Sequence, residues 1–578
     1  MKRLLVAICL LGLRNLAPAA EPSSSISWMA WGDAAWMQAK EQSKPLFVHV
    51  TTVGSERAAD MQRIAFKQAA VAEYLAQKFV CVQVDADERP GVLAALGAFV
   101  ADTQQEHGIP LNVWMSDTGA PLLGRTYLEP NDEWGKPGLL NLIERVASRQ
   151  ATDAQALRAD AAVLLESYFG RLPAGAADQA AATQEAVSFL TANMRPGGES
   201  PAITRLTPRA WHLLVQQAAQ GNVEAGNVRP LLQQLAAGPL RDAVSGAFFS
   251  RAATPEGDWP VFDVDAALQI GLAETYLAAA RLWPHEGFET VADELLAWLA
   301  DSVVSPTGLP IRLTTSLAAP SDSPFLWTLA DVQQGLTENA PAFDGWQGLT
   351  DKEKVPEAFD PNHLWRGRYR LSSSAMETLS VWPAVRSTLQ RTQRQRINES
   401  KPRSAPLGTQ ALAAVVLAEG GRQLGKPEYL AASGRLMSKW TQLSSEDIAG
   451  RLRRFVPDVP VTAQDVVAVM LAMVVEDQPA GGGEAAAARL ARLQLELQRH
   501  FLVDGIYGFP AGTALPYREV PDLREDGVLA TSNAIAVRLH RASGGRFGLA
   551  PELVWERAGR AVLAMPDEYP ELLRQLAP

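Results

Sequence analysis

The chain has 578 residues, of which 47% are hydrophobic and 20% are charged. This length exceeds one ordinary hydrophobic core and predicts two or more domains, and the composition is that of a globular protein, not a disordered one. The net charge of −11 disfavours a basic phosphate-binding surface, so we expect no nucleic-acid partner.

The first 20 residues have the pattern of a secretory signal peptide. A basic start, an apolar run and an A-x-A cleavage site follow one another: Lys2-Arg3, Leu4–Leu13 and Ala17-Pro18-Ala19. Cleavage predicts an exported protein, periplasmic or secreted, whereas an uncleaved short anchor is the alternative. No later run approaches the roughly 20 uninterrupted apolar residues of a membrane helix, so we expect no transmembrane segment after cleavage.

The chain has two cysteines, Cys9 and Cys81. Cys9 would leave with the signal peptide, so the mature chain could form no internal disulfide. Cys81 lies in the apolar run 79–82, which favours a buried strand cysteine over a reactive thiol.

Residues 21–150 alternate short apolar runs with helical stretches, which is the pattern of an α/β domain. A turn signal at Ser116–Gly119 predicts that the third apolar run forms a hairpin with the strand that follows the turn. The order β-α-β-α-β-β-α is the layout of thioredoxin. We expect strands at Leu46–Val50, Phe79–Val84, Leu111–Met115 and Pro121–Tyr127, and helices at Glu56–Gln77 and Gly138–Arg149.

Three acidic residues, Asp85, Asp87 and Glu88, follow the second expected strand. They could be read as paired catalytic carboxylates. We favour a polar turn, because the strand would end at Asp85 and Pro90 would begin the next helix.

Five motifs in order resemble the spermatogenesis-associated protein 20-like thioredoxin-domain family, whose bacterial members add a C-terminal (α/α) toroid of six helical hairpins. The resemblance covers about residues 28 to 130. The motifs are Trp28-x-x-Trp31-Gly32, Lys44-Pro45-Leu46-Phe47, Val84-Asp85-x-x-Glu88-Arg89-Pro90, Pro110-Leu111-Asn112-Val113 and Gly124-x-Thr126-Tyr127.

The proline before the third strand, Pro110, also fits this resemblance. In thioredoxin folds that proline is cis and lies beside the active-site loop, and an X-Pro bond tolerates the cis form. An ordinary proline at a strand start is the alternative reading.

The resemblance also exposes a loss. Family members carry Cys-His-Trp-Cys-His at the positions of residues 55–59, where this chain has Ser-Glu-Arg-Ala-Ala. Disulfide exchange needs a nucleophilic and a resolving thiol, so Ser55 and Ala58 predict a pseudoenzyme without disulfide oxidoreductase activity or cofactor. Ser55 is interpreted as the N-cap of the next helix; a nucleophilic Ser55 would need a base that the sequence does not offer.

Residues 151–578 are expected to form an all-α domain. Apolar residues recur at helical spacing and Gly and Pro separate the segments, which favours a closed (α/α) toroid over an open helical solenoid. Val264, Leu268, Leu272 and Tyr276 mark one helix face and Val291, Leu295, Trp298 and Leu299 the next. Further helices are expected at about Leu407–Leu424, Tyr429–Leu443, Ala463–Val475, Ala485–Phe501, Asn533–Ala542 and Glu552–Ala564.

Four residues of the toroid are candidate ligand-binding residues: Asp242, Trp259, Phe262 and Asp263. The resemblance implies a His-Phe-Glu-Lys motif at residues 261–264, of which only the ring and an acid remain. If this segment were helical, Asp263 and Asp265 would not share a face. The seven histidines show no metal-ligand spacing, so no metal is expected.

Aromatic residues gather near the expected hairpin loops, where they could line a glycan pocket or pack in the core. They are Phe248, Phe249, Trp259, Phe262, Trp327 and Trp346. The first hypothesis is a redox-inactive, exported binding or scaffold protein with an unknown protein or glycan partner. The alternative is a carbohydrate-active enzyme of glycosidase or epimerase type that uses Asp242, Asp258 and Asp263.

Overall fold

A computed structural model describes most of the chain and divides it into two compact units. Of the described residues, the first unit holds 26–51, 55–84 and 100–163, and the second holds 52–54, 85–99 and those from 164 onward. The expected signal peptide lies outside the described residues. These are 26–170, 175–194, 205–305, 308–315, 323–339, 354–359, 365–372, 382–441, 461–477, 483–525 and 528–577.

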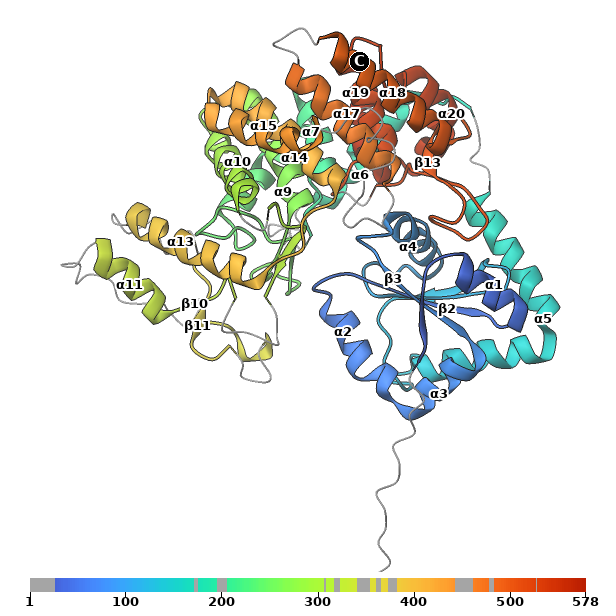
Figure 1. Cartoon of the computed structure of the whole chain (residues 1–578). Helices are drawn as coiled ribbons and strands as arrows, with labels where there is room; N and C mark the ends of the chain where they lie inside the picture. Colours follow the sequence, from blue (N-terminus) through green and yellow to red (C-terminus); the bar gives the residue numbers. More distant parts are fainter. Residues whose placement is uncertain are drawn as a thin grey trace, which may run out of the picture. The chain divides into compact units, whose positions relative to one another are not determined.

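The N-terminal sequence forms a five-stranded mixed sheet of thioredoxin type (Figure 1). The strand order is β1-β3-β2-β4-β5, with β1 parallel to β3 and with β4 antiparallel to both β2 and β5. The strands are β1 (Trp28–Ala30), β2 (Leu46–Thr51), β3 (Val80–Asp85), β4 (Leu111–Met115) and β5 (Pro121–Arg125). The helices are α1 (Asp33–Gln42), α2 (Glu56–Arg63), α3 (Ala69–Lys78), α4 (Pro90–Gln104) and α5 (Leu139–Phe169).

The expected strands are confirmed. Strand β1 was not predicted, because its three residues are too few to show alternation, and helix α1 was not predicted either. The helical stretch expected at roughly Glu56–Gln77 is confirmed, but it is divided: α2 ends at Arg63, and a 3₁₀ turn, Ala65–Lys67, precedes α3. The break lets the buried Phe66 ring pack edge-on against Trp28, with ring centroids 5.2 Å apart. Core packing thus overrides a continuous helical pattern.

Helix α5 runs through residue 150, where the boundary between the two domains was expected. Its backbone leaves helical geometry at Asp153 (φ −152°, ψ 73°). The Asp153 carboxylate accepts the Ala156 N–H at 2.9 Å, so Asp153 caps the second half of α5.

The second unit is mainly helical, as predicted. Its helices are α6 (Gln179–Met194), α7 (Pro208–Ala219), α8 (Val228–Ala237), α9 (Ala266–Leu282), α10 (Phe288–Val304), α11 (Leu329–Asn339), α13 (Trp382–Ser400), α14 (Leu407–Leu424), α15 (Pro427–Thr441), α17 (Ala463–Asp477), α18 (Glu484–Phe501), α19 (Ser532–Ala542), α20 (Pro551–Ala564) and α21 (Pro570–Leu576). Among the described residues, no helix is long and apolar enough to span a membrane.

Six of these helices close a ring. Going round it, α7 contacts α9, α9 contacts α14, α14 contacts α17, α17 contacts α19, α19 contacts α21, and α21 returns to α7. Other helices pack outside, such as α10 on α9, α15 on α14 and α18 on α17. The toroid, not the open solenoid, therefore describes this unit.

Hydrophobic patterning explains which helices lie inside the ring. Helix α14 buries residues on all of its sides, whereas outer helix α18 buries only a stripe at Leu490, Leu493 and Leu497. A helix that is apolar all round must be enclosed by others, and a one-sided helix leaves its polar face in water.

Short strands connect the helices in this unit. They are β6 (Arg251–Ala252), β7 (Pro260–Val261), β8 (Asp263–Asp265), β9 (Arg312–Thr314), β10 (Trp327–Thr328), β11 (Arg368–Tyr369), β12 (Leu502–Val503), β13 (Ile506–Phe509) and β14 (Val520–Pro521). The placement of Val264 on a helix face is wrong, because Val264 lies in β8. Helix α9 starts only at Ala266, where Asp265 caps it.

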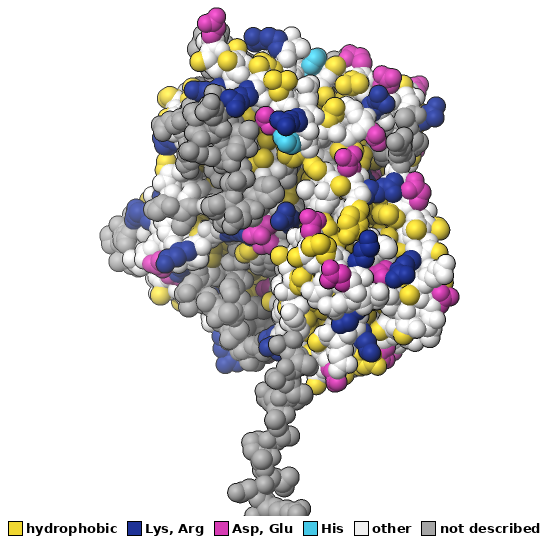
Figure 2. Space-filling model, turned by 45° about the vertical axis from the view of Figure 1, so that its right-hand side comes forward, with side chains coloured by type: hydrophobic (Ala, Val, Ile, Leu, Met, Phe, Trp, Pro, Cys, Tyr) yellow, Lys and Arg dark blue, Asp and Glu magenta, His cyan; other side chains and the backbone are white. Residues whose placement is uncertain are grey.

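Acidic and basic side chains are interspersed on the face that Figure 2 shows.

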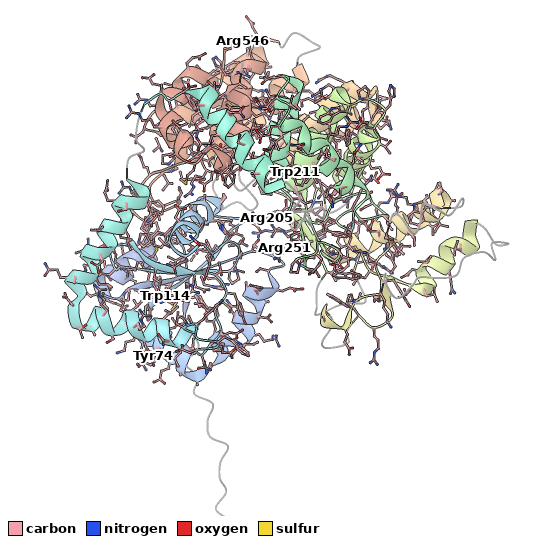
Figure 3. All side chains as sticks on the ribbon, turned by 180° about the vertical axis from the view of Figure 1, so that it is seen from behind. Tyr74, Trp114, Arg205, Trp211, Arg251 and Arg546 are labelled. Atoms are coloured by element: carbon pink, nitrogen blue, oxygen red, sulfur yellow. The ribbon has the colours of Figure 1, made fainter. Side chains whose placement is uncertain are left out.

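Buried aromatic residues anchor both units: Trp114 on β4 and Trp211 on α7, labelled in Figure 3, are 0% and 3% exposed.

Candidate functional site

The loop in which the family has its cysteines ends in a capped helix. The Ser55 hydroxyl accepts the Ala58 N–H at 3.3 Å, which confirms the predicted N-cap of α2. It also donates to the carbonyl oxygen of Ile109, 3.4 Å away. Ala58 is buried and contributes a methyl group. The two positions therefore supply a cap and a packing contact, and neither supplies a nucleophile.

The Ile109–Pro110 peptide bond is cis, as the sequence predicts, and Pro110 directly precedes β4. The bond from Ser55 to Ile109 brings the proline loop next to the N-terminus of α2. The backbone frame of a thioredoxin-type site is thus present without its thiols.

A buried histidine, His49, lies on β2 within the first unit and is not among the predicted site residues. Its Nδ1 lies 2.9 Å from Oδ1 of Asn112. The Asn112 amide nitrogen donates to the Thr126 carbonyl oxygen at 2.6 Å, so Asn112 Oδ1 is free to accept and His49 Nδ1 carries the proton. Burial lowers the pKa of His49 to about 4, against the opposing hydrogen bond with Asn112. A single histidine in the apolar run 46–50 was the available signal.

Cys81 is a buried cysteine of β3, as predicted. Its Sγ lies 3.6 Å from the Leu75 carbonyl oxygen. Burial raises the pKa of the Cys81 thiol to about 12, so almost no thiolate exists at neutral pH. Cys81 therefore cannot substitute for the missing cysteines.

In the second unit, an arginine joins the acidic residues of β8. Arg312 lies opposite Asp265 in the β8–β9 ladder, and its Nη2 is 2.9 Å from the Asp265 carboxylate. Its Nε is 3.4 Å from Asp263 Oδ1. The two acids share a face, because their segment is a strand and not a helix, and on a strand residues two apart point the same way.

The two carboxylates differ in their surroundings. Asp265 accepts the N–H groups of Ala267 and Leu268, at 2.9 and 3.2 Å, as the N-cap of α9. Among the described residues, Ser250 is the hydrogen-bond donor to Asp263, at 3.1 Å, and burial raises the pKa of Asp263 to about 6 despite Arg312. Asp263 can thus exchange a proton near neutral pH.

The other predicted acids do not join this pair. Asp242 is buried, and its carboxylate accepts the Ser245 N–H at 2.9 Å and the Gln393 side-chain amide at 2.9 Å. Asp258 accepts the Thr254 hydroxyl at 2.5 Å. Each carboxylate therefore has its own set of partners.

The candidate aromatic residues form a packed chain. Phe262 meets Phe249 edge-on at 5.2 Å and Trp259 at 5.9 Å, and Trp259 is only 5% exposed. The Arg370 guanidinium lies over the Trp259 ring, 4.7 Å from its centroid. Core packing describes these rings, and Trp346 lies outside the described residues.

An ion-pair network links helices of the inner ring, and no sequence motif predicted it. Arg209 of α7 pairs with Glu274 of α9, which also binds Arg538 of α19 at 2.5 Å. Arg538 reaches Glu419 of α14 at 2.7 Å. Burial opposes ionisation of Glu274, but the two guanidinium groups prevail and lower its pKa below the usual range. We interpret Glu274 as a structural residue, because its buried carboxylate is occupied by two guanidinium groups and its lowered pKa disfavours a proton-donor role.

Among the described residues, no group of three or more His, Cys, Asp or Glu side chains could hold a metal ion.

Comparison with known proteins supports the thioredoxin assignment. Residues 19–168 match a family model described as "Thioredox_DsbH: Protein of unknown function, DUF255". The N-terminal part of the chain is therefore similar to this thioredoxin-like family over residues 19–168.

Curated relatives include spermatogenesis-associated protein 20 of Homo sapiens, 26% identical over 418 residues, and that of Mus musculus, 25% identical over 418 residues. Each alignment covers 63% of this chain and 51% of the relative, so the chain spans about half the length of these relatives. An uncharacterised protein of Caenorhabditis elegans is 28% identical over 144 residues, which are 25% of this chain and 20% of that protein.

The mammalian matches extend well beyond the Thioredox_DsbH region, so the likeness includes part of the helical region. They agree with the resemblance that the sequence motifs indicated.

Proposed function

We propose that this protein is a redox-inactive thioredoxin-like protein, exported from the cytoplasm, that binds a protein or glycan partner without converting it. The observation that carries the proposal is the use of Ser55 as a helix cap beside a retained cis-proline loop. A thioredoxin-type frame without thiols can still hold a partner but cannot exchange disulfides.

The remaining cysteine supports this proposal. Cys81 is 3% exposed and its thiol pKa is about 12, so it offers neither access nor thiolate. Export is proposed from the signal pattern of residues 1–20 alone. N-terminal sequencing of protein isolated from a cell envelope fraction tests it: a start near residue 21 supports export, and an intact Met1 contradicts cleavage.

The decisive experiment is insulin-disulfide reduction by the full chain. The wild type should match the no-protein control. The variant Ser55→Cys/Ala58→Cys should gain activity, because its thiols lie one turn apart at the N-terminus of α2, where the helix dipole favours a thiolate. The single variant Ser55→Cys is the matched control and should stay inactive. Reduction by the wild type that disappears in Cys81→Ser would overturn the proposal.

A second candidate function is carbohydrate chemistry at Asp263. A pKa of about 6 suits Asp263 for proton transfer near neutral pH, and Arg312 holds a second carboxylate, that of Asp265, on the same strand face. Against this, Asp265 already accepts three donors, which leaves little capacity for substrate.

The two candidates are separated by a glycan-binding and hydrolysis screen of the wild type, Asp263→Asn and Trp259→Ala/Asp263→Ala. Hydrolysis or epimerisation lost in Asp263→Asn favours the enzyme. Binding without turnover, lost in the double variant, favours a glycan-binding protein. No glycan binding by the wild type ends the sugar hypothesis and leaves a protein partner.

A further inference from the structure

A tight turn in the first unit presents a tryptophan to solvent. Trp134 is 96% exposed, the most exposed of the large hydrophobic side chains in the described residues. The turn is closed by reciprocal backbone bonds between Glu133 and Lys136, N–H to carbonyl oxygen, of 3.1 and 2.8 Å. Exposing a whole indole ring costs free energy that any polar residue here would avoid.

The conformation of Trp134 adds a second cost. Its φ of 51° lies in the left-handed region, as does the φ of 75° at Gly135. Glycine or asparagine is the usual residue at such a turn position, and a bulky aromatic residue there is strained. Strain at an exposed position is a feature of functional sites, because nothing in the fold rewards it.

The neck of the loop is rigidly built. The Asp132 carboxylate accepts the Gly138 N–H at 2.8 Å and the Asn141 amide at 2.9 Å. A Cβ on Gly138 would lie 2.2 Å from the Asn131 carbonyl carbon, so the two sides of the neck touch. The indole is therefore presented on an ordered support, and binding need not first order the loop.

Charge and shape select the partner. The loop carries Glu129, Asp132 and Glu133 against one cation, Lys136, which is the wrong sign for an anionic membrane surface. The Asp132 oxygens are already engaged within the loop, and residues 131–136 are all exposed, so the loop builds no concave sugar site. An arginine fits both the exposed indole and the acidic side chains of the loop, because its guanidinium stacks on an indole face and pairs with carboxylates.

We propose that the Trp134 loop, residues 129–138, is a docking surface for an arginine-bearing segment of a partner protein. The arginine lies over the Trp134 ring, and Glu133 supplies the charge. The surface involves neither Ser55 nor Asp263, so the proposal stands independently of the proposed function.

The test is fluorescence anisotropy of a labelled glycine peptide that carries two arginines, titrated with the full chain at low ionic strength. The matched probe replaces both arginines by glutamine. The wild type should bind the arginine peptide and not the glutamine peptide. Trp134→Gly should weaken binding about three- to fivefold, Trp134→Tyr less, and Glu133→Gln about twofold.

Glycine relieves the left-handed strain, so Trp134→Gly should keep or raise the melting temperature, which separates lost contact from lost fold. The control Tyr517→Ala removes another exposed ring, 63% exposed, and should leave peptide binding unchanged. Equal binding by wild type and Trp134→Gly overturns the proposal. So does Trp134-dependent binding to neutral phosphatidylcholine vesicles or to maltoheptaose without binding to the arginine peptide.

Discussion

Arg312 and Asp265 face each other across the β8–β9 ladder, with the guanidinium Nη2 2.9 Å from the carboxylate. The same guanidinium reaches Asp263 at 3.4 Å, and the side chains of all three residues are less than a quarter exposed. The arginine thus neutralises two acids that would otherwise repel each other on one strand face.

Arg312→Gln should destabilise the second unit. It leaves two acids without their counter-charge, and breaking such a pair in a mostly buried setting costs about 2–3 kcal/mol. Urea unfolding followed by circular dichroism measures the change. The control Arg394→Gln removes an exposed pair with Asp301 and should cost less than about 1 kcal/mol. Equal costs for the two variants would contradict the role given to Arg312.

His49 should make the first unit less stable in mild acid. The pKa of His49 in the folded state is about 4, below its ordinary value of 6.5. Between pH 4 and pH 6.5, His49 therefore binds a proton in the unfolded chain but stays neutral in the folded chain. Stability contributed by neutral His49 is complete above pH 6.5 and falls as the pH drops to 4, by about 3 kcal/mol.

The measurement is the free energy of unfolding at pH 7 and pH 4.5 for the wild type and His49→Gln, which keeps a donor toward Asn112. The difference between the two pH values should shrink in His49→Gln. The exposed His107→Gln should leave that difference as in the wild type, and a similar reduction in both variants would refute the assignment.

Cys81 should be inert to thiol reagents in the folded protein. In a Cys9→Ser background, Ellman's reagent at pH 8 should react with Cys81 only after denaturation, because the folded thiol has a pKa of about 12 and is buried. A Ser55→Cys variant provides the positive control and should react in the folded state. Rapid modification of Cys81 in the folded protein would contradict the assignment of Cys81 as an unreactive, buried thiol.

Arg209→Met should be among the most destabilising substitutions in the helical unit. It leaves the buried Glu274 with one arginine instead of two, and losing one partner of a buried pair costs about 3–5 kcal/mol. Arg229→Met, whose partner pair with Glu286 lies at the surface, serves as the control. Thermal unfolding compares the two, and a similar small effect of both would show that the ring does not depend on this network.

Local sequence patterns determined much of this protein. Apolar runs located β2, β3 and β4, helical spacing located α14 almost to the residue, and Ser55 and Ala58, set against the motif of the resembling family, predicted a site without a dithiol. These features depend on neighbours within a few residues, where side-chain periodicity and capping chemistry act.

The tertiary structure decided the rest. Asp263 and Asp265 share a face because β9 pairs with their segment and makes it a strand, which local spacing cannot reveal. Glu274 meets Arg209 and Arg538 because the ring brings together helices far apart in sequence. Charges on separate helices acquire partners only when the chain closes, so their pKa values and their structural role are properties of the fold and not of any motif.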